Sequence, residues 1–456
     1  MTAAAPPKSA GRGTFPRGIH PPEAKHLAEN AAIEVLPTPK QVAVPLLQHT
    51  GAAAEPVVKP RQEVALGDVL GKSSGFISAA IHASVSGKTA MPSVATLPNG
   101  RHVKTVPLQA ADEQPLAGQA LYDDVLGGEW PIPAGTELEQ HDPQQIAEAA
   151  AQAGIVGLGG AAFPTHVKLV RNDAKPIDTL LVNGCECEPY LTADYRLMLE
   201  APRALLAGAA LAARANGAQR TLVVIEDNKP AAVDAVRKAA EGTTIETVVL
   251  PTKYPQGGEK QAIYAALGRT VPTGGLPLDV GVVVMNVGTA AALARAVLRG
   301  KPLTHRVVSV TGAAIAKPKN LLVPIGAPYR ALLEFCGGLT DDAARVVAGG
   351  PMMGFSLGDP DTPVTKGTSG VVALTERDIA RPPETACVRC GRCVDVCPVN
   401  LVPTKIAHAS KAKDWDLARR YQIPACIECG CCAYICPANI PLVQMIRAGK
   451  AELPKG

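Results

Sequence analysis

The chain has 456 residues, enough for three or four domains of ordinary size, so we expect more than one hydrophobic core. Hydrophobic residues make up 47% of the chain and charged residues 19%, a composition that excludes wholesale disorder. The net charge of +4 is too small to indicate a nucleic-acid-binding protein by itself, and the most informative count is that of the 12 cysteines.

The first 110 residues predict β structure after a short irregular start. Residues 1–35 are polar and rich in proline, whereas residues 36–110 alternate short apolar runs with glycine turns. This second stretch resembles the barrel-sandwich hybrid of biotinyl and lipoyl domains. Such carrier domains present a cofactor lysine at a hairpin tip, and neither Lys72 nor Lys88 has that setting. We therefore expect a structural module rather than a swinging arm.

The rest of the chain predicts a multidomain α/β protein. Residues 111–145 indicate a linker rich in proline and glycine. In residues 146–300, helices alternate with apolar strands such as IDTLLVNG and TLVVIED, which is typical of a Rossmann-like domain with a parallel sheet. Residues 301–378 contain strands around one helix and indicate a small β-grasp module. The last expected domain, residues 379–456, contains nine of the cysteines.

Eight of these nine cysteines lie in two short segments with the same spacing, and Cys431, between two of them, is either a small packing residue or a misassigned ligand. Residues 387–398 read CVRCGRCVDVCP and residues 426–437 read CIECGCCAYICP, so each has the pattern C-x2-C-x2-C-x3-C-P. This is the spacing of bacterial-type ferredoxins with two [4Fe–4S] clusters, in which the fourth cysteine of each run binds the other cluster. Zinc favours separated C-x2-C pairs, and a disulfide framework needs an oxidising compartment, for which the sequence has no export signal. The predicted ligands are Cys387, Cys390, Cys393 and Cys436 for one cluster and Cys426, Cys429, Cys432 and Cys397 for the other.

A glycine-rich segment, GIVGLGGAAFPTHVK at residues 154–168, is the second candidate site. Glycines let backbone N–H groups approach a phosphate or a planar ring, but no strand precedes this segment and it lacks the ending of a P-loop. The segment becomes better evidence for a ligand site because a polar motif, NGCECEPY at residues 183–190, follows a predicted strand. Polar residues at the carboxyl ends of strands, opposite a glycine-rich loop, are where α/β sheets bind ligands. Asn and Glu side chains in that position can bind the polar edge of a flavin.

In combination, these motifs resemble a known family. The glycine-rich segment, the pattern N-x-x-E-x-E-P, GGEK at residues 257–260 and MNVGT at residues 285–289 are together similar to the FMN- and NADH-binding subunit of respiratory complex I. With the two cysteine runs and FPRGIHPPEAK at residues 15–25, the chain resembles the C-subunit family of the Rnf (or Rsx) ion-translocating ferredoxin:NAD oxidoreductases, over nearly its whole length. In that family the β-grasp module is a soluble-ligand-binding (SLBB) domain.

The resemblance implies a set of cofactor contacts. The glycine-rich loop would lie along FMN and receive NADH over its ring, and Lys168 would face the FMN phosphate or ring. Asn183 and the two glutamates after it would contact the isoalloxazine and the nicotinamide, whereas the turn at residues 286–289 would bind a phosphate at a helix N-terminus. The implied contacts are Gly157, Gly159, Gly160, Ala161, Lys168, Asn183, Glu186, Glu188, Gly258, Glu259, Asn286 and Thr289.

The sequence departs from the complex I relatives in two places. Val156 and Leu158 flank Gly157 where those relatives carry arginine, and Cys185 replaces an acidic residue. The local charge therefore differs, so NADH affinity and flavin potential do not carry over from the relatives. No residue is assigned to acid–base or nucleophilic catalysis, because the nine histidines are scattered and hydride transfer needs none.

The expected function follows from these parts. NADH delivers two electrons as hydride and iron–sulfur clusters take one at a time, so FMN is the required converter. We expect electrons to pass from NADH through FMN and two [4Fe–4S] clusters to the other proteins of a membrane-embedded Rnf-type complex, with ferredoxin as an indirect partner and the reverse direction also open. The sequence contains no apolar run long enough to span a membrane. We therefore expect a peripheral protein on the cytoplasmic face of the bacterial inner membrane, without a nucleic-acid partner.

Two other functions are consistent with part of the sequence. A flavin-dependent cobalamin reductase of the microcompartment type shares the flavin loop and two clusters, but the N-terminal barrel-sandwich segment argues against it. A cluster-only electron-transfer scaffold would keep the cysteines and lack the flavin. Flavin binding and NADH oxidation distinguish these possibilities.

Overall fold

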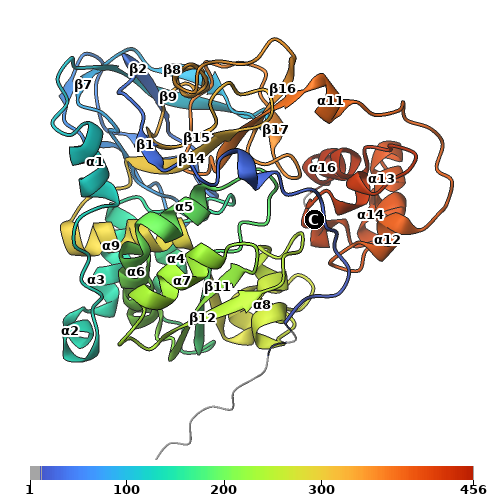
Figure 1. The fold of residues 1–456 in the computed structure, drawn as a ribbon, viewed down its shortest axis with the longest axis horizontal. Helices are drawn as coiled ribbons and strands as arrows, with labels where there is room; N and C mark the ends of the chain where they lie inside the picture. Colours follow the sequence, from blue (N-terminus) through green and yellow to red (C-terminus); the bar gives the residue numbers. More distant parts are fainter. Residues whose placement is uncertain (1–10, 12, 455–456) are drawn as a thin grey trace, which may run out of the picture.

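The computed structural model describes residues 11 and 13–454, which form several packed modules (Figure 1). The N-terminal strands lie beside the helices of a central α/β module, and the cysteine-bearing helices at the C-terminal end lie to one side. The N-terminal segment runs between the α/β module and the cysteine-bearing helices before it reaches β1. Within the described residues, none of the helices combines the length and the apolarity needed to cross a bilayer.

The N-terminal barrel module consists of two small antiparallel sheets, in agreement with the expected barrel-sandwich fold. Apolar side chains from both sheets, among them Val44, Leu70 and Leu108, are fully buried in one core. One sheet has the order β2-β9-β7-β4 with β8 beside β9, and the other has the order β3-β5-β6. The bounds are β2 (Gln41–Pro45), β3 (Glu55–Pro56), β4 (Glu63–Val64), β5 (Val69–Lys72), β6 (Ile81–His82), β7 (Gly87–Thr89), β8 (Ser93–Thr96) and β9 (His102–Ala110).

The central α/β module is built on a parallel sheet with the order β12-β11-β10-β13. Side chains alternate between its two faces, so Leu180 and Val182 pack with α6 and α9 while Leu181 packs with α8. The bounds are α3 (Pro143–Gln152), α4 (Thr165–Leu169), β10 (Thr179–Asn183), α5 (Ala193–Glu200), α6 (Pro202–Asn216), β11 (Arg220–Glu226), α7 (Pro230–Ala239), β12 (Ile245–Leu250), α8 (Glu259–Leu267), β13 (Val282–Asn286) and α9 (Val287–Arg299). The layers agree with the predicted Rossmann-like domain.

Helix α6 shows how the sequence determines this packing. Pro202 occupies its first turn, where a missing N–H is tolerated, and Gly217 ends it with a left-handed φ of 84°. Between these ends, Gly208 lies against α9 so closely that an added Cβ would stand 1.7 Å from the carbonyl oxygen of Ala290. The glycine is therefore what lets the two helices pack.

The expected linker at residues 111–145 is more ordered than its composition indicates. It contains α1 (Gly118–Val125) and α2 (Gly135–Gln140), and the apolar residues Leu121 and Trp130 are buried against the α/β module. Arg299 of α9 stacks on the Trp130 ring at 3.6 Å from its centroid. The segment thus covers one flank of the α/β module.

The β-grasp module forms a six-stranded sheet with the order β1-β15-β14-β18-β16-β17, covered by one helix. Its edge strand β1 comes from the N-terminal segment, which was expected to be irregular, and pairs in parallel with β15. The bounds are β1 (Ile33–Val35), β14 (His305–Thr311), β15 (Lys319–Pro324), α10 (Tyr329–Phe335), β16 (Ala343–Ala348), β17 (Phe355–Ser356) and β18 (Gly370–Thr375).

The C-terminal cysteine module is made of short helices around its own apolar core. The helix expected between the two cysteine runs is divided in two, because Lys413 has a left-handed φ of 56° and the Asp414 side chain caps the next helix. The bounds are α12 (Arg392–Asp395), α13 (Pro403–Ala412), α14 (Trp415–Arg420), α15 (Cys431–Tyr434) and α16 (Leu442–Glu452).

Candidate flavin and iron–sulfur sites

The glycine loop (residues 154–161) connects α3 to α4 and is closed by backbone hydrogen bonds to the residues just after it. The Gly157 N–H donates to the Phe163 carbonyl at 2.8 Å, and the Ala162 N–H donates to the Gly157 carbonyl at 3.1 Å. At the tip, Gly159 and Gly160 are exposed. Gly160 has a φ of +115°, and an added Cβ there would meet no atom within 4 Å. The loop therefore presents open backbone, which suits the approach of a planar ring or a phosphate.

Several predicted contacts converge at the carboxyl end of the parallel sheet. Lys168 donates from Nζ to Glu259 Oε1 at 2.7 Å and to the Val284 carbonyl at 3.0 Å. Asn183, at the end of β10, donates from Nδ2 to the Gly257 carbonyl at 2.8 Å. Gly258 is the residue before α8 and Glu259 is its first residue. The glycine loop, Lys168, Asn183 and the start of α8 are thus brought to one edge, as the sequence predicts.

Asn286 and Thr289 are placed behind the glycine loop rather than in front of it. The Asn286 side chain caps α9 by accepting from the N–H groups of Gly288 and Thr289. Thr289 is 2% exposed, and its Oγ1 accepts from the Leu158 N–H at 2.9 Å. Asn286 also lies beside Gly159, since an added Cβ there would stand 3.3 Å from the Asn286 Cβ. The Thr289 hydroxyl therefore supports the loop and is not open to a ligand.

Glu186 and Glu188 both bind backbone N–H groups. Glu186 caps α5, accepting from the Asp194 N–H at 2.8 Å and from the Tyr195 N–H at 3.0 Å. Glu188 accepts from the Met352 N–H at 3.1 Å and the Met353 N–H at 2.9 Å, which fastens the β-grasp module to the strand end. Burial raises the pKa of Glu188 to about 7, although these two bonds act in the opposite direction. Each carboxylate therefore joins two parts of the site: Glu186 binds the start of α5, and Glu188 binds the β-grasp module.

Asp194, which the sequence analysis did not select, connects these groups. Its Oδ2 accepts from Asn286 Nδ2 at 2.6 Å, so the capped ends of α5 and α9 are joined. Burial, followed by the nearby Glu186, raises the pKa of Asp194 to about 7. The only sequence signal for this residue is an acidic side chain in the first turn of the helix that follows the N-x-x-E-x-E-P motif.

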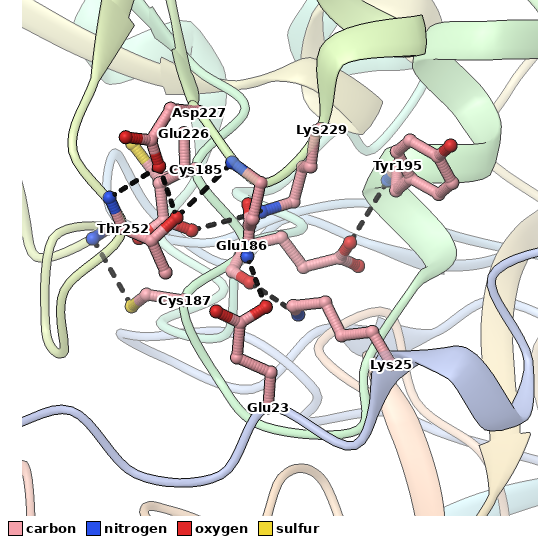
Figure 2. A network of polar contacts seen from close by, with 12 residues as sticks. Glu23, Lys25, Cys185, Glu186, Cys187, Tyr195, Glu226, Asp227, Lys229 and Thr252 are labelled. Carbon is pink, nitrogen blue, oxygen red and sulfur yellow. Dashed lines mark hydrogen bonds and ion pairs between the residues drawn. The ribbon is translucent and has the colours of Figure 1, made fainter.

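A polar network fastens the N-terminal segment to the same strand ends (Figure 2). Lys25 is 6% exposed, and its Nζ donates to the carbonyls of Glu186, Glu188 and Leu191 at 2.8, 3.0 and 2.7 Å. Cys187 Sγ accepts from the N–H group of Gly257 at 3.2 Å. Lys25 belongs to the FPRGIHPPEAK motif, which was recognised in the sequence without a role for this lysine.

The two thiols in this segment are not reactive groups. Cys185 is fully buried, and Cys187 packs against residues of the cysteine module. Burial, followed by the charge of Glu226, raises the pKa of both Cys185 and Cys187, so both stay protonated at neutral pH. Glu226 itself forms an ion pair with Lys229 at 3.0 Å, with both side chains 1% exposed. The cysteines therefore serve in packing and hydrogen bonding.

The structure gathers the eight predicted cluster ligands into two groups of four. One cavity is lined by Cys387, Cys390, Cys393 and Cys436, and another by Cys397, Cys426, Cys429 and Cys432, with the buried Cys431 as a fifth cysteine in its wall. Each group takes three cysteines from one run and the fourth from the other, which is the predicted exchange. Among the described residues, no three His, Cys, Asp or Glu side chains lie close enough together to bind a single metal ion. The cysteines instead line cavities. The donor set and the shape fit iron–sulfur clusters.

The two cavities differ in their distance from the α/β module. Tyr254, 2% exposed, donates from its hydroxyl to the Cys429 carbonyl at 2.8 Å. Gly18 of the N-terminal segment donates from its N–H to the carbonyl of Val396, the residue before Cys397, at 3.1 Å, and Arg17 donates to the carbonyl of Val394, which lines the other cavity, at 2.8 Å. We call the cavity that contains Cys397 and Cys429 the proximal cavity. The other, distal cavity has Cys387 and Cys390 exposed.

The family models that match this chain occur in the same order as the modules of the structure. The chain matches models of the RnfC barrel sandwich hybrid domain over residues 13–113, the Nuo51 FMN-binding domain over 150–295, the SLBB domain over 307–356 and the 4Fe-4S dicluster domain over 386–440. These matches confirm the predicted fold class and agree with FMN and two [4Fe–4S] clusters as the cofactors.

Curated relatives cover most of the chain. The C subunit of the proton-translocating ferredoxin:NAD(+) oxidoreductase complex of Clostridium ljungdahlii is 43% identical over 86% of this chain and 84% of its own length. The C subunit of the Na(+)-translocating complex of Acetobacterium woodii is 42% identical, over 89% of each chain. The C subunit of the ion-translocating oxidoreductase complex of Rhodobacter capsulatus is 41% identical over 88% of this chain and 76% of its own. This level of identity over most of each chain establishes a common family.

Proposed function

The chain belongs to the C-subunit family of the Rnf-type ion-translocating oxidoreductases, and from this premise we propose that it is the component that exchanges electrons with NADH. FMN, when bound, supplies the conversion between the two-electron chemistry of NADH and the one-electron chemistry of the clusters. The chain's own residues shape the glycine loop, place Lys168 and Glu259 at the sheet edge and hold the cysteine module against the α/β module.

The observation that carries this proposal is the contact between the flavin-binding module and the proximal cavity. Tyr254 lies directly before the loop at residues 255–258 that ends beside Asn183, and its hydroxyl binds the carbonyl of a predicted cluster ligand, Cys429. We propose that electrons pass from the flavin to the cluster of the proximal cavity and then to that of the distal cavity. The exposure of Cys387 and Cys390 supports the distal cavity as the point from which a partner protein accepts the electrons.

The partners in this proposal are the other proteins of a membrane-embedded complex. We place the chain at the cytoplasmic face of the membrane, because its substrate NADH is a cytoplasmic metabolite. A cobalamin reductase is not favoured, because the barrel module that distinguishes the two possibilities is present and matches the RnfC model.

The test uses the purified full-length chain after anaerobic iron–sulfur reconstitution and addition of FMN. We expect about eight iron atoms per chain, as two [4Fe–4S] clusters require, and loss of flavin and cluster absorbance when NADH is added. Iron without NADH oxidation in the presence of FMN would overturn the proposal and leave a cluster-only scaffold. The order of transfer is tested separately by the cysteine variants described in the Discussion.

A further inference from the structure

Two buried cations of the β-grasp module reach the glycine loop from behind. Lys366 is 1% exposed and Arg306, on β14, is 5% exposed. Lys366 Nζ donates to the carbonyl of Gly154 at 2.6 Å and to that of Ala80, in the barrel module, at 2.7 Å. One ammonium group thus joins three modules at the first residue of the loop.

Arg306 holds the middle of the same loop. Its guanidinium donates to the Leu158 carbonyl at 3.3 Å and also to the carbonyl of Lys366. The residue after Lys366 also contacts the loop, because an added Cβ at Gly367 would stand 3.5 Å from the Gly160 carbonyl. Leu158 is therefore held on both sides, by Arg306 at its carbonyl and by Thr289 at its N–H. The exposed tip lies directly after this clamp.

Burial lowers the pKa of Lys366 to about 7 and that of Arg306 to about 10, so Arg306 stays charged at neutral pH and the charge of Lys366 depends on its surroundings. Both side chains have little negative charge near them to balance a positive one. Neither forms an ion pair with any residue that the structure describes, and the carboxylate of Asp194 is the one that acts on Arg306 across space. The titratable neighbours of Lys366 are His49 and His82. Burial lowers the pKa of both imidazoles, that of His82 to about 3, so they supply no negative charge. Burying a charge without a partner is costly unless something else compensates it. An anion in the glycine loop would provide that compensation.

FMN has the charge that this arrangement lacks. Its phosphate is anionic, and hydride transfer from NADH releases NAD⁺ and adds one further negative charge to the flavin. A positive charge behind the loop therefore favours FMN binding, and it favours the reduced form more than the oxidised form. A unit charge about 10 Å away changes such an equilibrium by roughly tenfold at an effective dielectric of 20.

We propose that Lys366 and Arg306 are positioning residues of the flavin site, which fix the glycine loop and raise the reduction potential of bound FMN. This inference rests on the proposed function. It gives the β-grasp module a role in setting the flavin potential. The complex I relatives carry an arginine in the glycine loop, where this chain has Val156 and Leu158, and Lys366 and Arg306 would supply the positive charge from behind the loop instead.

The test compares four variants of the full-length reconstituted chain. Lys366→Met removes the charge and both hydrogen bonds, whereas Lys366→Gln removes the charge and keeps an amide that can donate. Arg306→Lys keeps the charge and loses the guanidinium fork that joins the carbonyls of Leu158 and Lys366. Lys317→Met is the matched control, because Lys317 is an exposed lysine of the same module. The readouts are the dissociation constant of FMN, from fluorescence quenching, and the midpoint potential of bound FMN, from dye equilibration.

At pH 6, below the pKa of Lys366, we expect both Lys366 variants to lose about tenfold in the preference for reduced over oxidised FMN, which lowers the two-electron potential by about 30 mV. Arg306→Lys should weaken FMN binding and leave the potential unchanged, and Lys317→Met should match the wild type in both. A wild-type potential in Lys366→Gln would overturn the electrostatic role, and wild-type FMN affinity in Arg306→Lys would overturn the clamp. If the wild-type chain itself bound no FMN, the proposed function would fail first, which distinguishes the two failures.

Discussion

The contact between Tyr254 and Cys429 gives the sharpest prediction about electron transfer. Tyr254→Phe removes only the hydroxyl, which leaves the Cys429 carbonyl without the donor that now lies at 2.8 Å. Leaving a buried acceptor unpaired costs about 1–3 kcal/mol. Because each 1.4 kcal/mol is a factor of ten, the cysteine module should detach from the α/β module roughly 5 to 150 times more often.

Stopped-flow spectroscopy measures the consequence. We expect NADH to reduce the flavin of Tyr254→Phe at the wild-type rate, because the flavin contacts are untouched, and to reduce the clusters more slowly. Tyr434→Phe is the matched control, because Tyr434 is a partly exposed tyrosine of the same cysteine module. Cluster reduction at the wild-type rate in Tyr254→Phe would refute the reasoning that this contact keeps the proximal cavity in place.

Three further predictions concern the clusters, the glycine loop and pH. Cys429→Ala and Cys390→Ala should each lower the iron content by about half, but NADH should still reduce the remaining cluster only in Cys390→Ala, and the opposite pattern would reverse the proposed order. Gly154→Ala should bind FMN more weakly and unfold at lower denaturant concentration, because Gly154 has a φ of +63° and an added Cβ would stand 2.1 Å from the Ala80 carbonyl. Asp194 has its folded-state pKa raised from 3.8 to about 7, so the folded state binds the proton more tightly and stability falls as pH rises from 4 to 7, by at most about 4 kcal/mol. In urea titrations from pH 4 to pH 8, Asp194→Asn should flatten this slope, and an unchanged slope would contradict the assignment.

The sequence predicted the cluster module because its information is local. The two C-x2-C-x2-C-x3-C-P runs contain the eight predicted ligands, all of which line the two cavities, and the exchange of the fourth cysteine follows from the motif alone. The order of the modules and the alternation of strands and helices were likewise readable from periodicity and turn residues. The linker was harder, because Leu121 and Trp130 are few among many glycines and prolines, yet they are enough to bury α1 on the α/β module.

The flavin site was only partly readable, because its supports come from distant parts of the chain. The glycine loop and the strand ends carry motifs, but what lies behind them does not. Lys366 reaches Gly154 across 212 residues, and Lys25 reaches Leu191 across 166. No spacing rule connects such pairs, since a lone lysine in an unremarkable segment is usually a solvated surface residue.

The motif residues Glu186, Glu188 and Thr289 share one visible role in the fold. Each binds backbone N–H groups: those at the start of α5, those of the β-grasp module, or that of Leu158 in the glycine loop. A motif residue can therefore act at a cofactor site by fixing the backbone that contacts the cofactor. The N-terminal segment and the β-grasp module bind the strand-end glutamates, and the barrel module binds the glycine loop through Thr50, which donates to the Ala161 carbonyl at 3.0 Å. The glycine loop takes its shape from the assembled chain, and its electrostatic potential depends on modules whose sequences carry no flavin motif.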